Sequence, residues 1–515
     1  MFGWLRPREA LSEAEVNRGL KPLLLDAVFA QSMGVLTSGA FLVAFALMMG
    51  ASLKVIGLLA AIGPIAQILQ IPAVFLVDRT RLRKALVVVP VFVARSLWLV
   101  IAALPWIVPH ESGLAILVVC LFASAGMGSV AGCAFNSWMR DLIPEKIMGS
   151  YFAKRMAAAI GVGAVVSLAA AFGVDFFKTQ FSEAGVYSIL FVIAVGFGTL
   201  STVFLTRVPE PRMAATPSRG LLAVLAEPFK NTRFRSVLFF LGSWSFAVNL
   251  AAPFFTVYML KRLGLSMSLI IVFAVTSQLF HVVFLRVWGR LADRFTNKSV
   301  LAVSAPMFMI SIVLWPFLTM PERYFLTIPL LVLIHALAGM SAAGVGLCAG
   351  NIALKAAPKG SATAYLATNA LVAGIASALA PIIAGILADQ LAAKELSLTF
   401  RWGEIGEGAS AFAVPAISLR GLDFLFILSF VLGLYAVHRL LAIQEHGEVE
   451  ESVVVTELYA QARRMARAVS TVEGLRQLTL FPYEKLKELV TGRPRNTSAI
   501  PRDEIEDETD TTPDD

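Results

Sequence analysis

Charged residues are absent from long stretches of this chain and gather in the short segments between them. About 20 residues of helix cross the hydrocarbon core of a bilayer. Stretches of at least 18 residues without Asp, Glu, Lys or Arg therefore predict transmembrane helices. There are ten: 27–53, 55–77, 112–139, 156–174, 184–206, 236–260, 263–285, 299–321, 324–354 and 360–388.

Two further stretches complete the set. Residues 85–110 are interrupted only by Arg95, and residues 421–441 carry Asp423 and Arg439 near their ends. Twelve spans make an all-α polytopic membrane protein the expected fold class. Residues 389–420, between the last two spans, are expected to form a longer loop.

Composition excludes a soluble main body. Hydrophobic residues make up 57% of the chain and charged residues 15%, against about 25% charged in soluble domains. Soluble enzymes, nucleic-acid binders and disordered proteins are excluded on this ground. The sequence contains no Walker loop, HExxH pair or nucleophile elbow, so it indicates no ATPase or other enzyme, no cofactor and no metal site.

The net charge of +8 is the sum of two opposing parts. Residues 1–442 carry 34 Lys and Arg against 19 Asp and Glu, and residues 443–515 carry 9 against 16. The basic excess lies in short loops, and alternate connections hold 23 and 8 Lys and Arg. The positive-inside rule places both termini in the cytoplasm. No cleavable signal is evident, and the expected location is a plasma membrane of the bacterial inner-membrane kind.

A repeat relates the two halves of the chain. Its matches, at offsets of 214 or 215, are Gly50–Ile56 with Gly264–Ile270, Asp78-Arg79 with Asp293-Arg294, Asn136 with Asn351, Pro144 with Pro358, Tyr151 with Tyr365, and Asp175 with Asp389. Because six spans separate them, the halves share an orientation, which implies a pseudo-twofold axis along the membrane normal. The expected segments are an N-terminus 1–21, a half 22–207, a central loop 208–233, a half 234–442 and a charged tail 443–515.

At this point the chain resembles the major facilitator superfamily, whose signature after spans two and eight reads roughly Gly-x-x-x-Asp-Arg-x-Gly-Arg-Arg/Lys. The second copy runs from Gly289 through Asp293 and Arg294 to Lys298, with Thr296 in place of the second glycine. The first copy keeps its charges but lacks both glycines. The resemblance covers residues 20–442 and does not identify a subfamily.

The resemblance implies that charged residues of the signature form a cytoplasmic latch between the halves. The candidates are Asp78, Arg79, Arg81, Arg83, Gly289, Asp293, Arg294 and Lys298, with Arg140 and Arg155 as partners for Asp78 and Asp141. The alternative is that these cations only fix the topology. The connection 140–155 is expected to be a loop, which Trp138 and Tyr151 could hold at the interface.

Polar residues within spans are candidates for the solute or coupling site, because ionisable groups at membrane depth usually face a cavity. They are Asp26, Gln31, Arg95, Trp244, Asn249, Gln278, His281 and His335. In the family, spans one, four, seven and ten line the cavity, which implies that Gln31, Trp244, Asn249 and His335 lie on cavity-lining helices. Arg95 lies on span three, and we expect it to pair with Asp26, directly or through one water. The alternatives are an anion anchor for Arg95 and, for each residue singly, a packed and hydrogen-bonded side chain.

The resemblance also has limits. The family's span-four arginine falls at Phe122, and span five lacks the Gly-Pro-x-x-Gly-Gly element of drug–proton antiporters. Both departures argue against a standard drug exporter. The central loop predicts a proline-rich turn and a short surface helix over 221–229. The tail predicts helices over 448–470 and 472–490 and a disordered acidic end, 503–515.

We therefore expect secondary or facilitative transport of a small solute by alternating access. Symport with a proton or ion, and export or exchange, both remain open. The rival from another class is a transport-inactive sensor or scaffold that signals through its tail. Expected partners are the solute, the bilayer and a coupling proton or ion, with no nucleic acid and a monomer as the working unit.

Overall fold

The computed structural model describes residues 7–9, 11–213, 228–319, 324–358, 362–403, 411–443, 445 and 451–470. Most of the surface helix expected over 221–229 lies outside these residues. So do the tail segments expected over 472–490 and 503–515.

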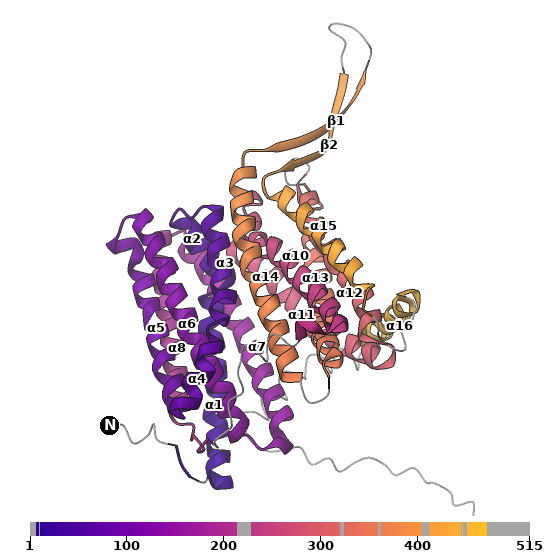
Figure 1. Cartoon of the computed structure of the whole chain (residues 1–515). Coiled ribbons are helices and arrows are strands. Elements are labelled where there is room, and N and C mark those ends of the chain that lie inside the picture. The colour runs from indigo at the N-terminus through magenta and orange to yellow at the C-terminus, as the bar shows by residue number, and fades with distance from the viewer. Residues whose placement is uncertain are drawn as a thin grey trace, which may run out of the picture. The chain divides into compact units, whose positions relative to one another are not determined.

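The first half of the chain forms six membrane spans (Figure 1). Span one is two consecutive helices and span two is a bent pair. In order, the helices are α1 (Glu13–Leu36) and α2 (Gly39–Met48), α3 (Leu53–Gln67) and α4 (Gln70–Thr80), α5 (Arg83–Ile107), α6 (His110–Leu142), α7 (Glu145–Phe177) and α8 (Glu183–Thr206).

The second half repeats this order. Its helices are α10 (Thr232–Val257) continued by the π-helix η2 (Tyr258–Arg262), α11 (Met267–Arg294), α12 (Asn297–Val313) followed by the 3-10 helix η3 (Trp315–Leu318), α13 (Thr327–Ala356), α14 (Ala362–Leu391) and α15 (Leu422–Leu440). Across the described residues, ten spans are long and apolar enough to cross a membrane. The α3–α4 pair, bent by 43°, is an eleventh, and α12 is a shorter apolar helix. The predicted twelve-helix fold class agrees with this count.

Two expected loops have regular structure instead. The connection 389–420 contains the antiparallel hairpin β1 (Glu395–Gly403) and β2 (Ala411–Arg420). The loop expected over 140–155 shrinks to Ile143 and Pro144, because α6 and α7 continue beyond their apolar stretches on charged, helix-compatible residues.

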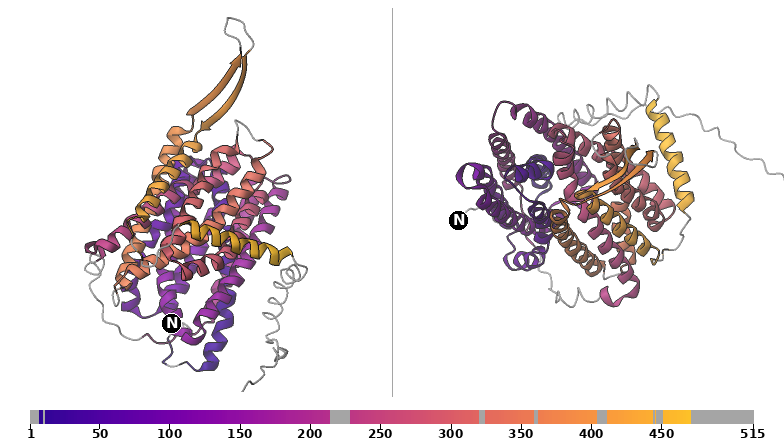
Figure 2. Two further views of the ribbon diagram at one scale, coloured as in Figure 1. Left: turned by 90° about the vertical axis from the view of Figure 1, so that its right-hand side faces the viewer. Right: turned by 90° about the horizontal axis from the view of Figure 1, so that it is seen from above.

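The helices of the bundle end at two opposite faces. The termini face holds the start of α1, residues 81–84 and residues 207–213, and the hairpin face, opposite, holds β1 and β2 (Figure 1). Figure 2 shows the hairpin standing beyond the ends of the helices. Because spans alternate in direction, α3 and α11 begin at the hairpin face, whereas α5 and α12 begin at the termini face.

The halves meet through particular helices. Most contacts lie within a half, and the main contacts between halves are α3 along α14 and α7 along α11. At the α3–α14 contact the backbones touch, since a Cβ added to Gly57 would lie 2.1 Å from the carbonyl oxygen of Pro381. On the termini side of the same span, α4 packs against α5 and α6 of its own half.

The tail contributes one described helix, α16 (Glu451–Ser470). This agrees with the helix predicted over 448–470. Most of α16 belongs to a second compact unit, Val455–Asp515, and the twelve spans belong to the first unit, Met1–Val454.

Candidate functional site

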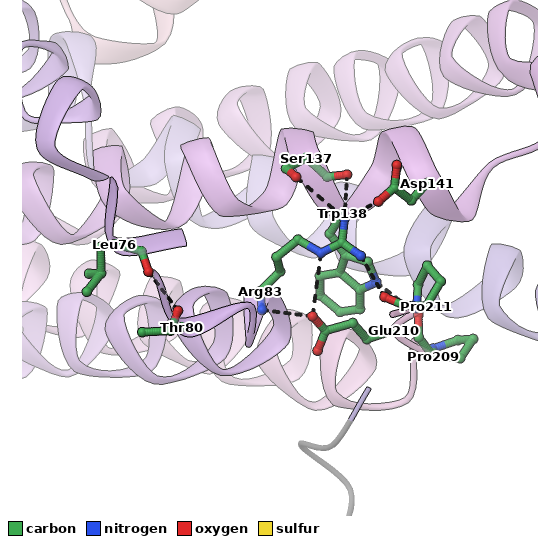
Figure 3. Close-up of polar contacts among 9 residues, drawn as sticks. All are labelled: Leu76, Thr80, Arg83, Ser137, Trp138, Asp141, Pro209, Glu210 and Pro211. Atoms are coloured by element: carbon green, nitrogen blue, oxygen red, sulfur yellow. Dashed lines mark hydrogen bonds and ion pairs between the residues drawn. The ribbon is translucent and has the colours of Figure 1, made fainter. Parts of the chain in front are cut away.

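Arg83 is the centre of a buried polar cluster on the termini face (Figure 3). Its guanidinium is ion-paired with Asp141 at the end of α6, lies 3.5 Å from Glu210, and donates to the carbonyl oxygen of Pro211 at 2.6 Å. The side chains of Arg83 and Glu210 are both 0% exposed. Leaving one member of such a pair alone costs on the order of 3 kcal/mol, so this cluster fixes three segments together: the start of α5, the end of α6 and residues 210–211.

Glu210 also completes the start of α5. Its carboxylate accepts the backbone N–H of Arg83, the first residue of the helix, at 2.8 Å. The first N–H groups of a helix have no partner within it, and a carboxylate there also gains from the helix dipole. Burial raises the pKa of Glu210, against the opposing effect of the N–H groups of Lys84 and Arg83 and of the Arg83 guanidinium.

Glu445 has the same task in the second half. It follows α15 as Glu210 follows α8, and it accepts the N–H of Lys298 in the first turn of α12 at 2.9 Å. It also accepts from Asn297 at 3.1 Å and pairs with Lys355 at 2.9 Å. Burial opposes the charge of Glu445, but these donors outweigh it and lower the pKa of the carboxyl. Neither glutamate is among the candidates predicted from the sequence, although each is an acid a few residues beyond the end of a six-span half.

The expected latch residues differ in burial and in their ion pairs. Arg83 is fixed by Glu210 and Asp141, so the pairing of Asp141 with Arg140 or Arg155 is wrong. Asp78 and Asp293 form no ion pair within the described part of the chain, and Asp293 is exposed. Of the remaining candidates, Arg79, Arg140 and Arg294 are exposed and Gly289 and Lys298 are half-buried on the termini side.

Arg81 has an uncommon backbone. It ends α4 with φ at +51°, in the left-handed region that favours glycine. This is the position of the second glycine in the family signature. In the second copy Thr296 has φ of −154° and caps α12, so only the first copy uses the left-handed turn.

A second polar cluster lies inside the first half. Asp26 of α1 is 4% exposed and pairs with Arg155 of α7 at 3.4 Å. Its other oxygen accepts from Ser201 of α8 at 2.6 Å. Arg95 of α5 donates to the same Ser201 hydroxyl at 2.9 Å and to Gly198 and Thr202, each at 2.5 Å.

The expected Arg95–Asp26 pair is thus present only through a third residue. Among the described side chains, Arg95 makes no direct ion pair with Asp26, and Ser201 occupies the place expected for a water. The acid is instead neutralised by Arg155, which had been assigned to the loop. Arg155 reaches Asp26 because α7 continues as a helix through residues 145–155.

The other membrane-depth residues are held mainly within their own half. Trp244 packs on Phe308 with ring centres 5.8 Å apart, and Asn249 donates to Ser377 at 3.1 Å. The ring of His335 stacks on that of Phe273 with ring centres 5.1 Å apart, and its Nδ1 lies 2.9 Å from the carbonyl oxygen of Leu331. Gln31 of α1 lies against Gly163 of α7, His281 is half-buried and Gln278 is exposed.

The described residues contain no group of three or more His, Cys, Asp or Glu side chains that could hold a metal ion.

The sequence and fold were compared with known proteins. A family model described as Major Facilitator Superfamily matches residues 27–381 and 245–427. A search of curated protein sequences gave no significant match.

Solved transporter structures share the fold. The nucleoside transporter NupG is 13% identical and superposes with a TM-score of 0.60 over 83% of this chain and 98% of its own. A bacterial homologue of the human lysosomal transporter Spinster, inward-facing and unoccupied, is 15% identical, with a TM-score of 0.57 over 84% and 97%. A POT family transporter in complex with 5-aminolevulinic acid is 14% identical, with a TM-score of 0.56 over 85% and 97%.

The first prediction concerns Ser201. In a double-mutant cycle of Arg95→Leu with Asp26→Leu, melting temperatures in detergent should show a favourable coupling, on the order of 1 kcal/mol for residues of one network. Repeating the cycle in a Ser201→Ala background should abolish most of it, because the hydroxyl joins the two charges. Coupling that is unchanged without Ser201 would contradict the bridge.

The second prediction concerns pH. The lowered pKa of Glu445 means that its contribution to stability is present above the unfolded value of about 4.3 and is lost as the pH falls through the folded value. Glu445→Gln should therefore melt below the unaltered protein at pH 7, and the difference should shrink below about pH 4.3. A difference that grows with acidification would contradict this assignment.

Proposed function

The chain belongs to the major facilitator superfamily of solute transporters, and we propose that its halves, 22–207 and 234–442, carry a small solute by alternating access. The observation that supports this mechanism is unequal contact between the halves. They meet through α3 on α14, where Gly57 and Gly385 bring the backbones together, and through α7 on α11, whereas α4 packs within its own half. Such a pair of units can open at one face while the other remains closed.

The proposal assigns the termini face to the cytoplasm. The connections on this face carry 23 Lys and Arg and those on the hairpin face 8, which is the bias of a cytoplasmic side. We propose a plasma membrane of the bacterial inner-membrane kind, and we assign the structure to an inward-facing state because α4 packs within its own half on this side. We assign no catalysis to the chain and expect a monomer to be the working unit.

Two acids on this face fit the role of an open latch. Asp78 and Asp293 lie at corresponding points of the repeat, and neither has an ion-pair partner among the described residues. In contrast, Arg83 is held inside its half by Glu210 and Asp141. The free acids are therefore the groups available to pair across the halves when the cytoplasmic face closes.

The class of the transported solute is to be identified by an uptake assay with a panel of compounds. Solved structures with this fold include a nucleoside transporter and a POT family transporter in complex with 5-aminolevulinic acid. Nucleosides, 5-aminolevulinic acid and short peptides therefore form the first panel. Uptake of each labelled compound is measured in proteoliposomes, with and without an imposed proton gradient, against protein-free liposomes.

Saturable uptake that needs the protein supports the proposal, and stimulation by the gradient identifies proton coupling. A matched protein truncated after Val454, which lacks the second unit, separates the rival function. A transporter should keep its flux without this unit. If no compound in a broadened panel moves, while a signalling output is lost with the unit, the sensor interpretation replaces the transporter.

The third prediction tests the latch. Asp293→Asn should lower the initial uptake rate about tenfold, equivalent to about 1.4 kcal/mol, at unchanged abundance, since the residue is exposed and forms no ion pair with the residues that the structure describes. Glu145→Gln is the matched control, because Glu145 is an exposed acid on the same face outside the signature. Normal kinetics in Asp293→Asn would remove this residue from the latch.

A further inference from the structure

At the hairpin face, two aspartates each accept hydrogen bonds from the other half of the chain. Asp389, at the end of α14, accepts the backbone N–H groups of Leu53 at 2.9 Å and Lys54 at 3.2 Å. These are the first two residues of α3, in the other half. One carboxylate of the second half thus covers a helix start of the first half.

The reverse contact is made by Asp175, near the end of α7. It accepts the N–H groups of Met267 at 2.9 Å and Ser268 at 2.7 Å, the first two residues of α11. The pairs Asp175 with Asp389 and Leu53 with Met267 are both separated by 214 residues. The two contacts are therefore copies of one another under the internal repeat, crossing in opposite directions.

Each helix already has a local cap that leaves these N–H groups unpaired. Ser52 accepts from Val55 and Ser266 accepts from Leu269, both at 3.4 Å. The first two N–H groups remain and need another acceptor. Hydrogen bonds to a carboxylate are stronger than neutral ones, and the positive end of the helix dipole adds to them.

The geometry points to Asp175 and Asp389 as positioning residues of the transport cycle. We propose that their two carboxylate-to-helix contacts hold the hairpin face closed, and that both contacts break whenever this face opens. The inference rests on the proposed alternating access. It follows because no rigid separation of α3 from α14, or of α7 from α11, can preserve a contact within hydrogen-bond distance.

The positions of the contacts suit this role. Both aspartates are half-buried, and neither forms an ion pair within the described residues. Water can therefore replace the lost N–H donors when the face opens. The Arg83–Glu210 pair differs, because it is wholly buried and joins segments of one half.

The test measures opening directly by pulsed electron paramagnetic resonance. Spin labels are placed at Gln180 and Lys261, which are exposed on the hairpin face in different halves, after Cys120, Cys133 and Cys348 are replaced by serine. Asp175→Asn, Asp389→Asn and the double variant are compared with the unaltered labelled protein. Each single variant should raise the population with a longer label separation about tenfold relative to the closed one, and the double variant should raise it further.

Glu183→Gln is the matched control. Glu183 is an acid on the same face, but it pairs with Lys178 of its own half at 2.7 Å, so its loss should leave the label distances unchanged. Leu53→Pro tests the contact from the donor side, since proline suits the first position of a helix and removes one N–H group. The extended backbone of Ser52 accepts a following proline, and this variant should also open the face.

Unchanged distance distributions in the double variant and in Leu53→Pro would overturn the inference, even if melting temperatures fall. The outcome is separable from that of the proposed function. A shifted distance distribution without uptake of any solute would support the role of the two aspartates in closing the face and would contradict the proposed transport. Uptake at normal rates with unchanged label distances would support the proposed transport and would contradict the role of the two aspartates in closing the face.

Discussion

The start of a helix leaves N–H groups without partners inside the helix, and a carboxylate placed there gains from the helix dipole. Four helices of this chain solve the problem with a carboxylate from a distant segment. Glu210 covers the start of α5, Glu445 that of α12, Asp389 that of α3 and Asp175 that of α11. Each contact ties a helix start to one particular segment elsewhere in the chain.

The two kinds of contact differ in what they join. The two glutamates make contacts within their own half at the termini face. Glu210 does so together with Arg83, which is buried, and Arg83 in turn pairs with the half-exposed Asp141. The aspartates act between halves at the hairpin face. Each half is therefore internally tied where it carries most of its charge, and the movable contacts lie at the opposite ends of the spans.

The internal polar cluster illustrates how far sequence reasoning reaches. The need of Arg95 for a partner follows from the cost of a cation at membrane depth, and Asp26 is indeed part of its network. The intermediate, Ser201, carries no such signal, since serines are common in apolar helices. Arg155 was assigned to a loop because charged residues ended the apolar stretch, whereas α7 continues through them.

The sequence by itself determined the twelve spans, because lipid imposes the length and polarity of every span. Matched residues at a constant offset determined the parallel halves and the correspondence of Asp175 with Asp389. The tertiary structure decided which helix start each acid covers, the pairing of Arg83 with Asp141 and of Arg155 with Asp26, and the hairpin in place of a loop. These depend on which ends meet in space. Periodicity along a chain does not contain that information, since any acid at a span end could serve any helix start on the same face.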